Sequence, residues 1–282
     1  MTELVIHPLT RKRIEEFAQA PSHALLLVGP SGIGKGSLVR QLTSQLMEIA
    51  QAKIDAHQYV RIIAPGKDKG ISIEKVRELE QFLSRKVPGG GRRVVLVEDA
   101  QLLSVEAQNA LLKTLEEPPE NTVLLLTVAH EQALLPTIRS RAQVMTVVRP
   151  EAAAVKDHFM QNGSDSNLIA RAYAMSGGLP GLMAAILSRE HEHPLLQAAT
   201  TARQIAQSNM FERLAMVDGL SKDREQCVQV LSVLQQMARV SLRSGNMAES
   251  WQRILKGSHA AIGELSASGQ PKLVLTNLML SI

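Results

Sequence analysis

The sequence predicts an α/β fold with a parallel sheet, followed by a region that is helical throughout. Short apolar runs alternate with helical patterns as far as Val148, which is typical of a parallel sheet covered by helices on both faces. After Pro150 no convincing strand pattern occurs, and every periodic run has helical spacing. A glycine-rich turn joins the first strand to the first long helix, as in many such folds.

The individual elements follow from the spacing of apolar residues between turn signals. Strands are expected at the short apolar runs 24–28, 59–64, 93–97, 122–128 and 143–148. Helices are expected where apolar residues recur every three or four positions: 8–20, 37–50, 73–83 and 104–116, with a short turn or helix at 136–141. The same spacing later predicts helices at 155–161, 168–175 and 179–188, then a helical block from residue 192 to residue 282.

Composition narrows the class of protein. The chain has 282 residues, 45% of them hydrophobic, so we expect two domains or one domain with appendages. The net charge of +4 is compatible with DNA contact without requiring it. Aromatic residues form 2% of the chain, which argues against binding single strands by base stacking. Four basic residues flank a second loop with several glycines, at residues 88–91, and either contact phosphates or are solvated: Arg85, Lys86, Arg92 and Arg93.

The cysteine count and the apolar runs bear on metal binding and compartment. A single cysteine, Cys227, excludes an internal disulfide and a zinc site of several cysteines, and its apolar setting predicts a buried thiol. No apolar run approaches the ~20 residues that span a bilayer, and the N-terminus has no signal-peptide core. We therefore expect a soluble cytoplasmic protein without membrane contact.

The stretch ALLLVGPSGIGKGSLV, residues 24–39, carries the first functional motif. Gly29, Gly32 and Gly34 supply backbone positions that other residues adopt only at a steric cost, and Lys35 follows directly. This is the G-x-x-x-x-G-K core of a P-loop, whose backbone N–H groups hold a phosphate chain while the lysine neutralises it. An ordinary strand-to-helix turn is the alternative, and the joint occurrence of spacing, lysine and context argues against it.

One position departs from the P-loop pattern. The residue after the lysine is ordinarily Ser or Thr, whose hydroxyl ligates Mg²⁺, but here it is Gly36, with Ser37 one position further on. A phosphate cradle survives this change because it is built from main chain, whereas metal-assisted hydrolysis is expected to suffer. Nucleotide binding and nucleotide turnover are therefore separate questions.

A second motif follows the strand at 93–97, which ends in Glu98 and Asp99. In P-loop enzymes an acid at this place holds Mg²⁺ or its water, and a neighbouring carboxylate orients the attacking water. Glu98 is then the acid on the metal side and Asp99 the acid on the water side. Each is one methylene longer or shorter than the residue that active enzymes usually have there, which moves its carboxylate by ~1 Å, and such a misplacement can lower the rate about 100-fold. The alternative is a solvated strand end. Thr127 is placed either to sense the terminal phosphate or as a sheet threonine with a satisfied hydroxyl.

A longer stretch, SVEAQNALLKTLEEPPENTVLLLTVAHEQALLPTIRSRAQ at residues 104–143, is more specific than either motif. It resembles the clamp-loader branch of the AAA+ ATPases, in particular the delta-prime subunits of bacterial DNA polymerase III. The resemblance continues upstream through IIAPGKDKGISIEKVRELEQFLSRKVPGGGRRVVLVEDA and downstream through AMSGGLPGLMAAIL and PKLVLTNLMLSI. It implies an AAA+ P-loop domain at 1–148, a helical lid domain at 149–191 and a helical collar domain for oligomerisation at 192–282.

The resemblance also implies a role in DNA replication, as a component of DNA polymerase III without polymerase activity of its own. Such proteins sit in a pentameric ring with gamma/tau-type and delta-type subunits, which places a sliding clamp on primed DNA, with ATP bound at subunit boundaries. The family's Ser-Arg-Cys signature corresponds to Ser140-Arg141-Ala142, which implies that Arg141 reaches a neighbour's ATP site as an arginine finger. A surface arginine after a short helix is the alternative.

The chain departs from the family at three further places, two of them in its own nucleotide site. It has no four-cysteine zinc module, Leu182 stands where relatives present a lid arginine, and Gly36 removes the magnesium hydroxyl. ATP binding is therefore expected to be weak or vestigial, with Mg²⁺ doubtful and no zinc. Two alternatives remain open: a gamma-like or DNA-repair AAA+ enzyme that hydrolyses ATP, and a structural binder that takes no nucleotide.

Overall fold

The computed structural model describes residues 4–65, 70–84, 87–88, 91–188, 194–244, 248–267 and 269–282. Arg85, Lys86 and the expected domain boundary between residues 191 and 192 lie outside these ranges. The chain divides into two compact units. The first consists of Met1–Pro30 and Gly34–Pro150, and the second of Ser31–Ile33 and Glu151–Ile282.

The first unit is built on a parallel sheet of five strands in the order β2-β3-β4-β1-β5. Its strands are β1 (Ala24–Val28), β2 (Val60–Ile63), β3 (Arg93–Val97), β4 (Thr122–Val128) and β5 (Gln143–Thr146). The three inner strands, β1, β3 and β4, have the predicted bounds because each is paired on both sides and almost wholly apolar. The edge strands β2 and β5 are shorter than predicted, since each pairs with a single neighbour.

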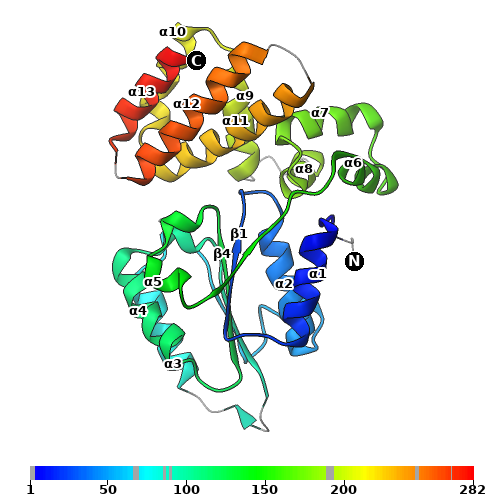
Figure 1. The fold of residues 1–282 in the computed structure, drawn as a ribbon, viewed down its shortest axis with the longest axis vertical. Helices are drawn as coiled ribbons and strands as arrows, with labels where there is room; N and C mark the ends of the chain where they lie inside the picture. The colour runs from blue at the N-terminus through cyan, green and yellow to red at the C-terminus, as the bar shows by residue number, and fades with distance from the viewer. Residues whose placement is uncertain are drawn as a thin grey trace. The chain divides into compact units, whose positions relative to one another are not determined.

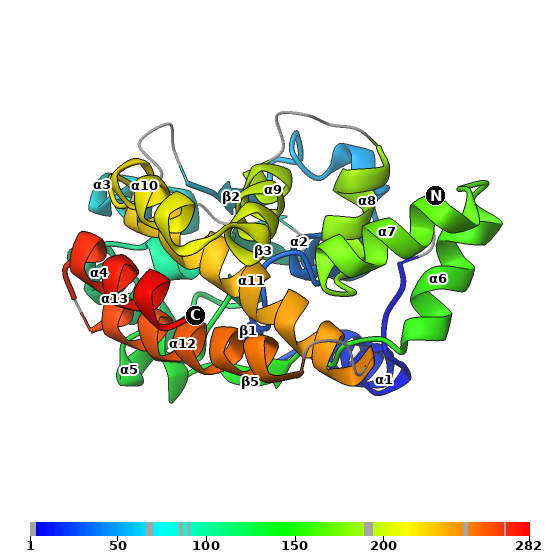
Figure 2. The same ribbon diagram turned by 90° about the horizontal axis from the view of Figure 1, so that it is seen from above.

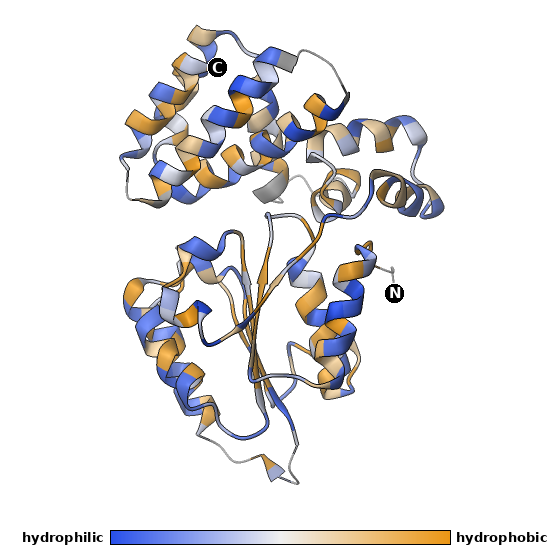
Figure 3. Ribbon diagram, in the orientation of Figure 1, coloured by the Kyte–Doolittle hydropathy of each residue, from blue (hydrophilic) through white to orange (hydrophobic). Residues whose placement is uncertain are grey.

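Helices cover both faces of this sheet, as the alternating pattern predicts (Figure 1). α1 (Pro8–Gln19) and α2 (Lys35–Met47) lie on one face, and α3 (Ile73–Leu83), α4 (Val105–Glu116) and the short α5 (Pro136–Arg139) on the other. Single 3-10 turns occur at Gln51–Lys53, Ala100–Leu102 and Glu131–Ala133. Figure 3 shows the strands as a band of hydrophobic residues between these two layers.

The core beneath α3 and α4 is made of aliphatic side chains. Leu79, Leu111 and Leu115 belong to one cluster with Leu124 and Leu126 of β4, and none of these five is more than 2% exposed. Burying one leucine side chain stabilises a fold by about 1.5–3 kcal/mol, so this cluster fixes β4 firmly against α3 and α4. β3 pairs with β4 along its whole length, so the carboxyl ends of the two strands are held in place relative to each other.

Helix starts are decided by capping groups. α2 begins at Lys35, two residues before the predicted start, because Gly34 takes a left-handed conformation with φ 102° and serves as its N-cap. α4 begins after Ser104, whose Oγ accepts a hydrogen bond of 3.1 Å from the N–H of Ala107.

Arg93 is a buried residue, which corrects the expectation that it either contacts phosphates or is solvated. Its side chain is 3% exposed, and its guanidinium donates to the carbonyl oxygens of Leu83 and Phe82 at the end of α3. It also lies 5.4 Å from the centre of the Phe82 ring. A cation at a helix C-terminus is favoured by the helix dipole, so Arg93 joins β3 to α3. Arg92 is half-buried and donates to Leu46 O at 3.2 Å.

The second unit is helical in all its described elements, as predicted. The helices are α6 (Ala152–Gln161), α7 (Ser166–Ser176), α8 (Pro180–Leu187), α9 (Pro194–Gln207), α10 (Met210–Leu220), α11 (Arg224–Ser244), α12 (Ala248–Ser266) and α13 (Pro271–Ser281). The long helices α11 and α12 pack side by side, and α9 packs on α11 (Figure 2). Leu182 on α8 is fully buried, so its side chain is part of the core of this unit.

Cys227 is fully buried, as its apolar setting predicts, and its Sγ donates to Leu220 O at 3.1 Å. Burial, assisted by the nearby Asp223 carboxylate, raises the pKa of this thiol to about 11. The thiol is therefore uncharged and unreactive in the folded protein. None of the helices in the described ranges has both the length and the apolar composition that crossing a bilayer requires.

Candidate functional site

The two predicted motifs lie at one edge of the sheet. β1 and β4 end level with each other, since Val28 pairs with Val128, and β3 ends two residues earlier, since Val97 pairs with Leu126. The glycine-rich loop leaves β1 at this edge, and Glu98 follows β3 there. Ligands of open parallel sheets bind outside the carboxyl ends of the strands, so this edge is the candidate site.

The glycine-rich loop has the backbone of a phosphate cradle. Gly32 and Gly34 have φ values of 84° and 102°, which residues with a Cβ adopt only under strain. Gly29 does not have a positive φ, so a left-handed backbone occurs at two of the three predicted positions. Nothing lies within 4 Å of the position that a Cβ on Gly34 would take, so the backbone angle rather than space requires glycine there. α2 begins at the next residue, and the N–H groups of its first turn are the donors that bind anions at helix N-termini.

Lys35 lies across this loop and is only 6% exposed. Its Nζ donates to Gly29 O at 2.6 Å and to Pro30 O at 3.3 Å. Burial lowers the pKa of Lys35 to about 8, against the opposing effect of the Asp99 carboxylate. The ammonium group therefore rests on carbonyls of its own loop, at the place where it can instead neutralise a bound phosphate.

Asp99 and Thr127 hold the ends of β3 and β4 together. The Asp99 N–H donates to Thr127 Oγ1 at 3.0 Å, and the Thr127 side chain is 3% exposed. Asp99 has a left-handed backbone with φ 51°, and its Oδ1 accepts a bond of 3.0 Å from Gln101 Nε2. The Thr127 hydroxyl thus serves the main chain in this structure, as expected for a sheet threonine, and retains one hydrogen to donate.

Glu98 is paired with a residue that the sequence did not single out. Its Oε1 lies 3.3 Å from Arg40 Nε, and Arg40 Nη1 lies 3.1 Å from both carboxylate oxygens of Asp55. The spacing of four between Gly36 and Arg40 was the available signal, because it places both on one face of α2. The partner carboxylates could not be found this way, since they are distant in the sequence.

The residues at this edge fit a phosphate chain but do not fit Mg²⁺. The main-chain cradle and Lys35 are in place for phosphate. Gly36 has no hydroxyl, and Ser37 points about 100° away from it around the helix. The Glu98 carboxylate is paired with a guanidinium. Within the described residues, no group of three or more His, Cys, Asp or Glu side chains is arranged to hold a metal ion.

Arg141 lies at the opposite edge of the sheet from the glycine-rich loop. It precedes β5, whose first residue Gln143 pairs with Leu25 near the start of β1, four residues before Gly29. At about 3.3 Å per residue, this separates the two edges by roughly 13 Å. Arg141 Nη2 pairs with Glu116 Oε1 at 2.8 Å, and the two side chains are 36% and 49% exposed. The Arg141 guanidinium is therefore a surface group remote from its own loop.

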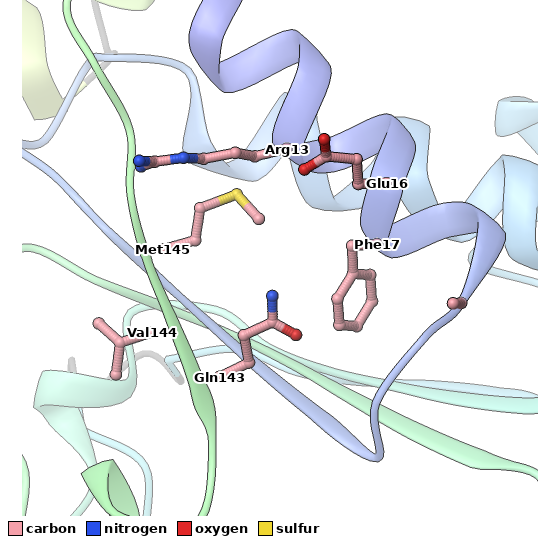
Figure 4. A pocket seen from close by; sticks show the side chains of 7 residues that line it. Arg13, Glu16, Phe17, Gln143, Val144 and Met145 are labelled. Carbon is pink, nitrogen blue, oxygen red and sulfur yellow. The ribbon is translucent and has the colours of Figure 1, made fainter.

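One hollow of the first unit lies away from these motifs. It has a volume of about 400 Å³ and lies between α1 and the edge strand β5, where Arg13, Phe17 and Met145 are among its lining residues (Figure 4). None of the predicted site residues lines it.

Comparisons with known proteins agree with the resemblance. The family model described as DNA polymerase III, delta subunit, matches residues 13–151. The chain is 30% identical over 250 residues to DNA polymerase III subunit delta' of Pseudomonas aeruginosa, covering 83% of this chain and 66% of that protein. It is 33% identical over 172 residues to the delta' subunit of Haemophilus influenzae, covering 56% and 53%. The chain thus spans about half to two thirds of the length of these relatives.

A solved structure supports the fold. The DNA polymerase III gamma subunit-related protein of Thermotoga maritima matches with a TM-score of 0.50 at 20% identity, over 95% of this chain and 97% of that one. Together with the five-stranded parallel sheet and the helical second unit, this likeness confirms the predicted fold class, an α/β domain with a parallel sheet followed by helices.

Proposed function

Because the chain belongs to the family of DNA polymerase III delta-prime subunits, we propose that it is a clamp-loader subunit that donates an arginine finger to a neighbouring ATPase subunit. In this proposal it assembles with gamma/tau-type and delta-type subunits into a pentameric ring. The ring opens the sliding clamp and places it on primed DNA. The chain's own P-loop contributes little or no ATP hydrolysis.

The position of Arg141 carries the proposal. The guanidinium lies at the amino edge of the sheet, whereas the P-loop lies at the carboxyl edge. Arg141 therefore cannot reach a phosphate held by its own chain. It is one third exposed, so it is accessible to another protein. A guanidinium that contacts the γ-phosphate from a second protein stabilises the charge that develops in the transition state.

The intramolecular contacts of Arg141 are compatible with this role. Besides the pair with Glu116, Nη1 donates to Thr137 O at 3.1 Å. An ion pair between two exposed side chains contributes only about 0–1 kcal/mol, because water screens it. Moving the guanidinium to a phosphate, with which it forms stronger two-point hydrogen bonds, is therefore energetically accessible.

The P-loop supports the second part of the proposal, which is a weak or absent ATPase. Metal-assisted hydrolysis needs a hydroxyl after the P-loop lysine and a free acid after β3. Gly36 supplies no hydroxyl, and Glu98 is paired with Arg40. Nucleotide binding by the main chain is retained in this proposal, whereas turnover is not.

The test is the ATPase activity of a ring reconstituted with gamma/tau-type and delta-type subunits, sliding clamp and primed DNA. The Arg141→Ala ring is expected to lose most of its DNA-stimulated hydrolysis, in the range of 10³-fold where such a finger is fully engaged. Lys113→Ala is the matched control, because Lys113 is an exposed cation on the same helix as Glu116 and is expected to leave hydrolysis unchanged. An Arg141→Ala ring as active as the control would refute the finger, and robust hydrolysis by the isolated chain would favour an autonomous ATPase.

A further inference from the structure

Arg40 lies on α2, the helix that follows the P-loop, near the edge of the sheet where a phosphate chain would bind. It is four residues after Gly36 on α2, so the two residues share one face of the helix. Arg40 Nε lies 3.3 Å from Glu98 Oε1, the carboxylate that follows β3 at the same edge of the sheet as the glycine-rich loop. Nothing lies within 4 Å of the Cβ position of Gly36, so the space that a Ser or Thr side chain would fill is open.

Two carboxylates hold the Arg40 side chain in this place. Nε contacts Glu98 Oε1 at 3.3 Å, and Nη1 contacts both oxygens of Asp55 at 3.1 Å. Arg40 and Glu98 are 34% and 25% exposed, and Asp55 is 64% exposed. The Asp55 carboxylate thus fixes the outer end of the guanidinium, while Nε faces the acid at the end of β3.

This arrangement conflicts with a divalent cation at the same acid. Mg²⁺ requires near-octahedral oxygen ligands at about 2.0–2.1 Å, and a guanidinium beside the acid both occupies its oxygen and repels a second cation. The hydroxyl that would be a further ligand is absent at Gly36. The positive charge that offsets Glu98 is therefore already part of the protein.

We propose that Arg40 replaces the divalent cation of this site, so that the P-loop binds polyphosphate anions, such as a nucleoside triphosphate, in their metal-free form. This proposal rests on the phosphate-binding role of the P-loop given above. Arg40 offsets the Glu98 carboxylate, which otherwise repels a phosphate chain held by the loop. The site then lacks the hydroxyl that would ligate Mg²⁺ at Gly36, and it carries the fixed positive charge of Arg40 one helical turn later in place of the metal ion.

The proposal predicts opposite effects for the two partners of the ion pair. Arg40→Ala leaves the Glu98 carboxylate without its cation, and the affinity for metal-free ATP should fall by about tenfold. Glu98→Gln leaves Arg40 positive beside the loop, and the same affinity should rise by a similar factor. A purely structural role of the ion pair predicts that both variants weaken binding.

The test is equilibrium binding of labelled ATP to the full chain, in EDTA and in excess Mg²⁺, with pyrophosphate as a competing ligand. Wild-type affinity is expected to be as high in EDTA as in Mg²⁺. The double variant Gly36→Thr with Arg40→Ala should instead bind about tenfold more tightly in Mg²⁺, because a hydroxyl and a free acid are then available. Pyrophosphate should displace ATP, since the loop binds the phosphates and not the base. Binding that only unlabelled ATP reverses would overturn the polyphosphate assignment.

Arg61→Ala is the matched control. Arg61 forms an exposed ion pair with Glu78 at 2.6 Å, so its removal changes the net charge equally and is expected to leave ATP affinity unchanged. Wild-type binding that requires Mg²⁺, or no binding in either buffer, would overturn the inference. The second result would leave the Arg141 proposal intact, because that proposal is measured by hydrolysis in the reconstituted ring. Circular dichroism of each variant separates lost binding from lost folding.

Discussion

Replacing Arg93 tests whether a cation that looks solvated in the sequence is part of the core. The side chain is 3% exposed and donates to two carbonyls at the end of α3, with the Phe82 ring 5.4 Å away. Hydrogen bonds to a charged group contribute about 1.5–3 kcal/mol, and a buried cation–π contact adds about 1 kcal/mol. Burial also lowers the pKa of Arg93, which marks a desolvation cost that a neutral residue does not carry.

The balance of these effects predicts that Arg93→Ala lowers the free energy of unfolding by about 3 kcal/mol. Arg93→Met retains the apolar stem and should cost about 2 kcal/mol. With a urea dependence of about 2 kcal/mol per molar, the alanine variant should unfold at ~1–2 M less urea. The measurements are urea unfolding followed by circular dichroism, and hydrogen exchange at α3 and β3.

Arg92→Ala is the control for this experiment. Arg92 is the neighbouring residue with the same charge, but it is half-buried and makes a single described bond to Leu46 O. Its replacement is expected to cost less than about 1 kcal/mol. If the Arg92 and Arg93 variants unfold at the same urea concentration, the reasoning about the buried cation is wrong.

Three further predictions concern the P-loop lysine, the arginine finger and the buried thiol. Since the pKa of Lys35 is lowered to about 8, the loop without ligand loses its positive charge as the pH rises above 8. The affinity for ATP in EDTA should therefore fall from pH 7 to pH 9. The variant Lys35→Arg should show no such fall, because arginine does not titrate in this range. Glu116→Gln frees Arg141 from an exposed ion pair, so ATPase activity of the reconstituted ring should rise, by no more than about fivefold for a pair of this kind, and a decrease would contradict the competition between Glu116 and the phosphate. Cys227 should react with a thiol reagent in the native protein far more slowly than in urea, and equal rates would disprove its burial.

Local features of the sequence were sufficient to predict the inner strands and the phosphate-binding loop. β1, β3 and β4 are apolar runs buried on both faces, and such runs are recognised without knowledge of their neighbours. Gly32, Gly34 and Lys35 lie within four residues of one another, so their spacing alone specifies the cradle. The start of α2 and the ends of β2 and β5 were less well predicted. The N-cap at Gly34 decides where α2 begins, and pairing with a single neighbouring strand decides where β2 and β5 end.

The tertiary structure decided every pairing between distant charges. Arg40 and Glu98 are 58 residues apart in the sequence and meet only because α2 packs beside the end of β3. Arg93 looks like a solvated strand start, and only the packing of the last turn of α3 makes it a buried cap. The parallel direction and register of β5 against β1 place Arg141 at the edge opposite the loop. Periodicity reports which face of an element is buried, whereas electrostatic partners depend on which elements the sheet order brings together.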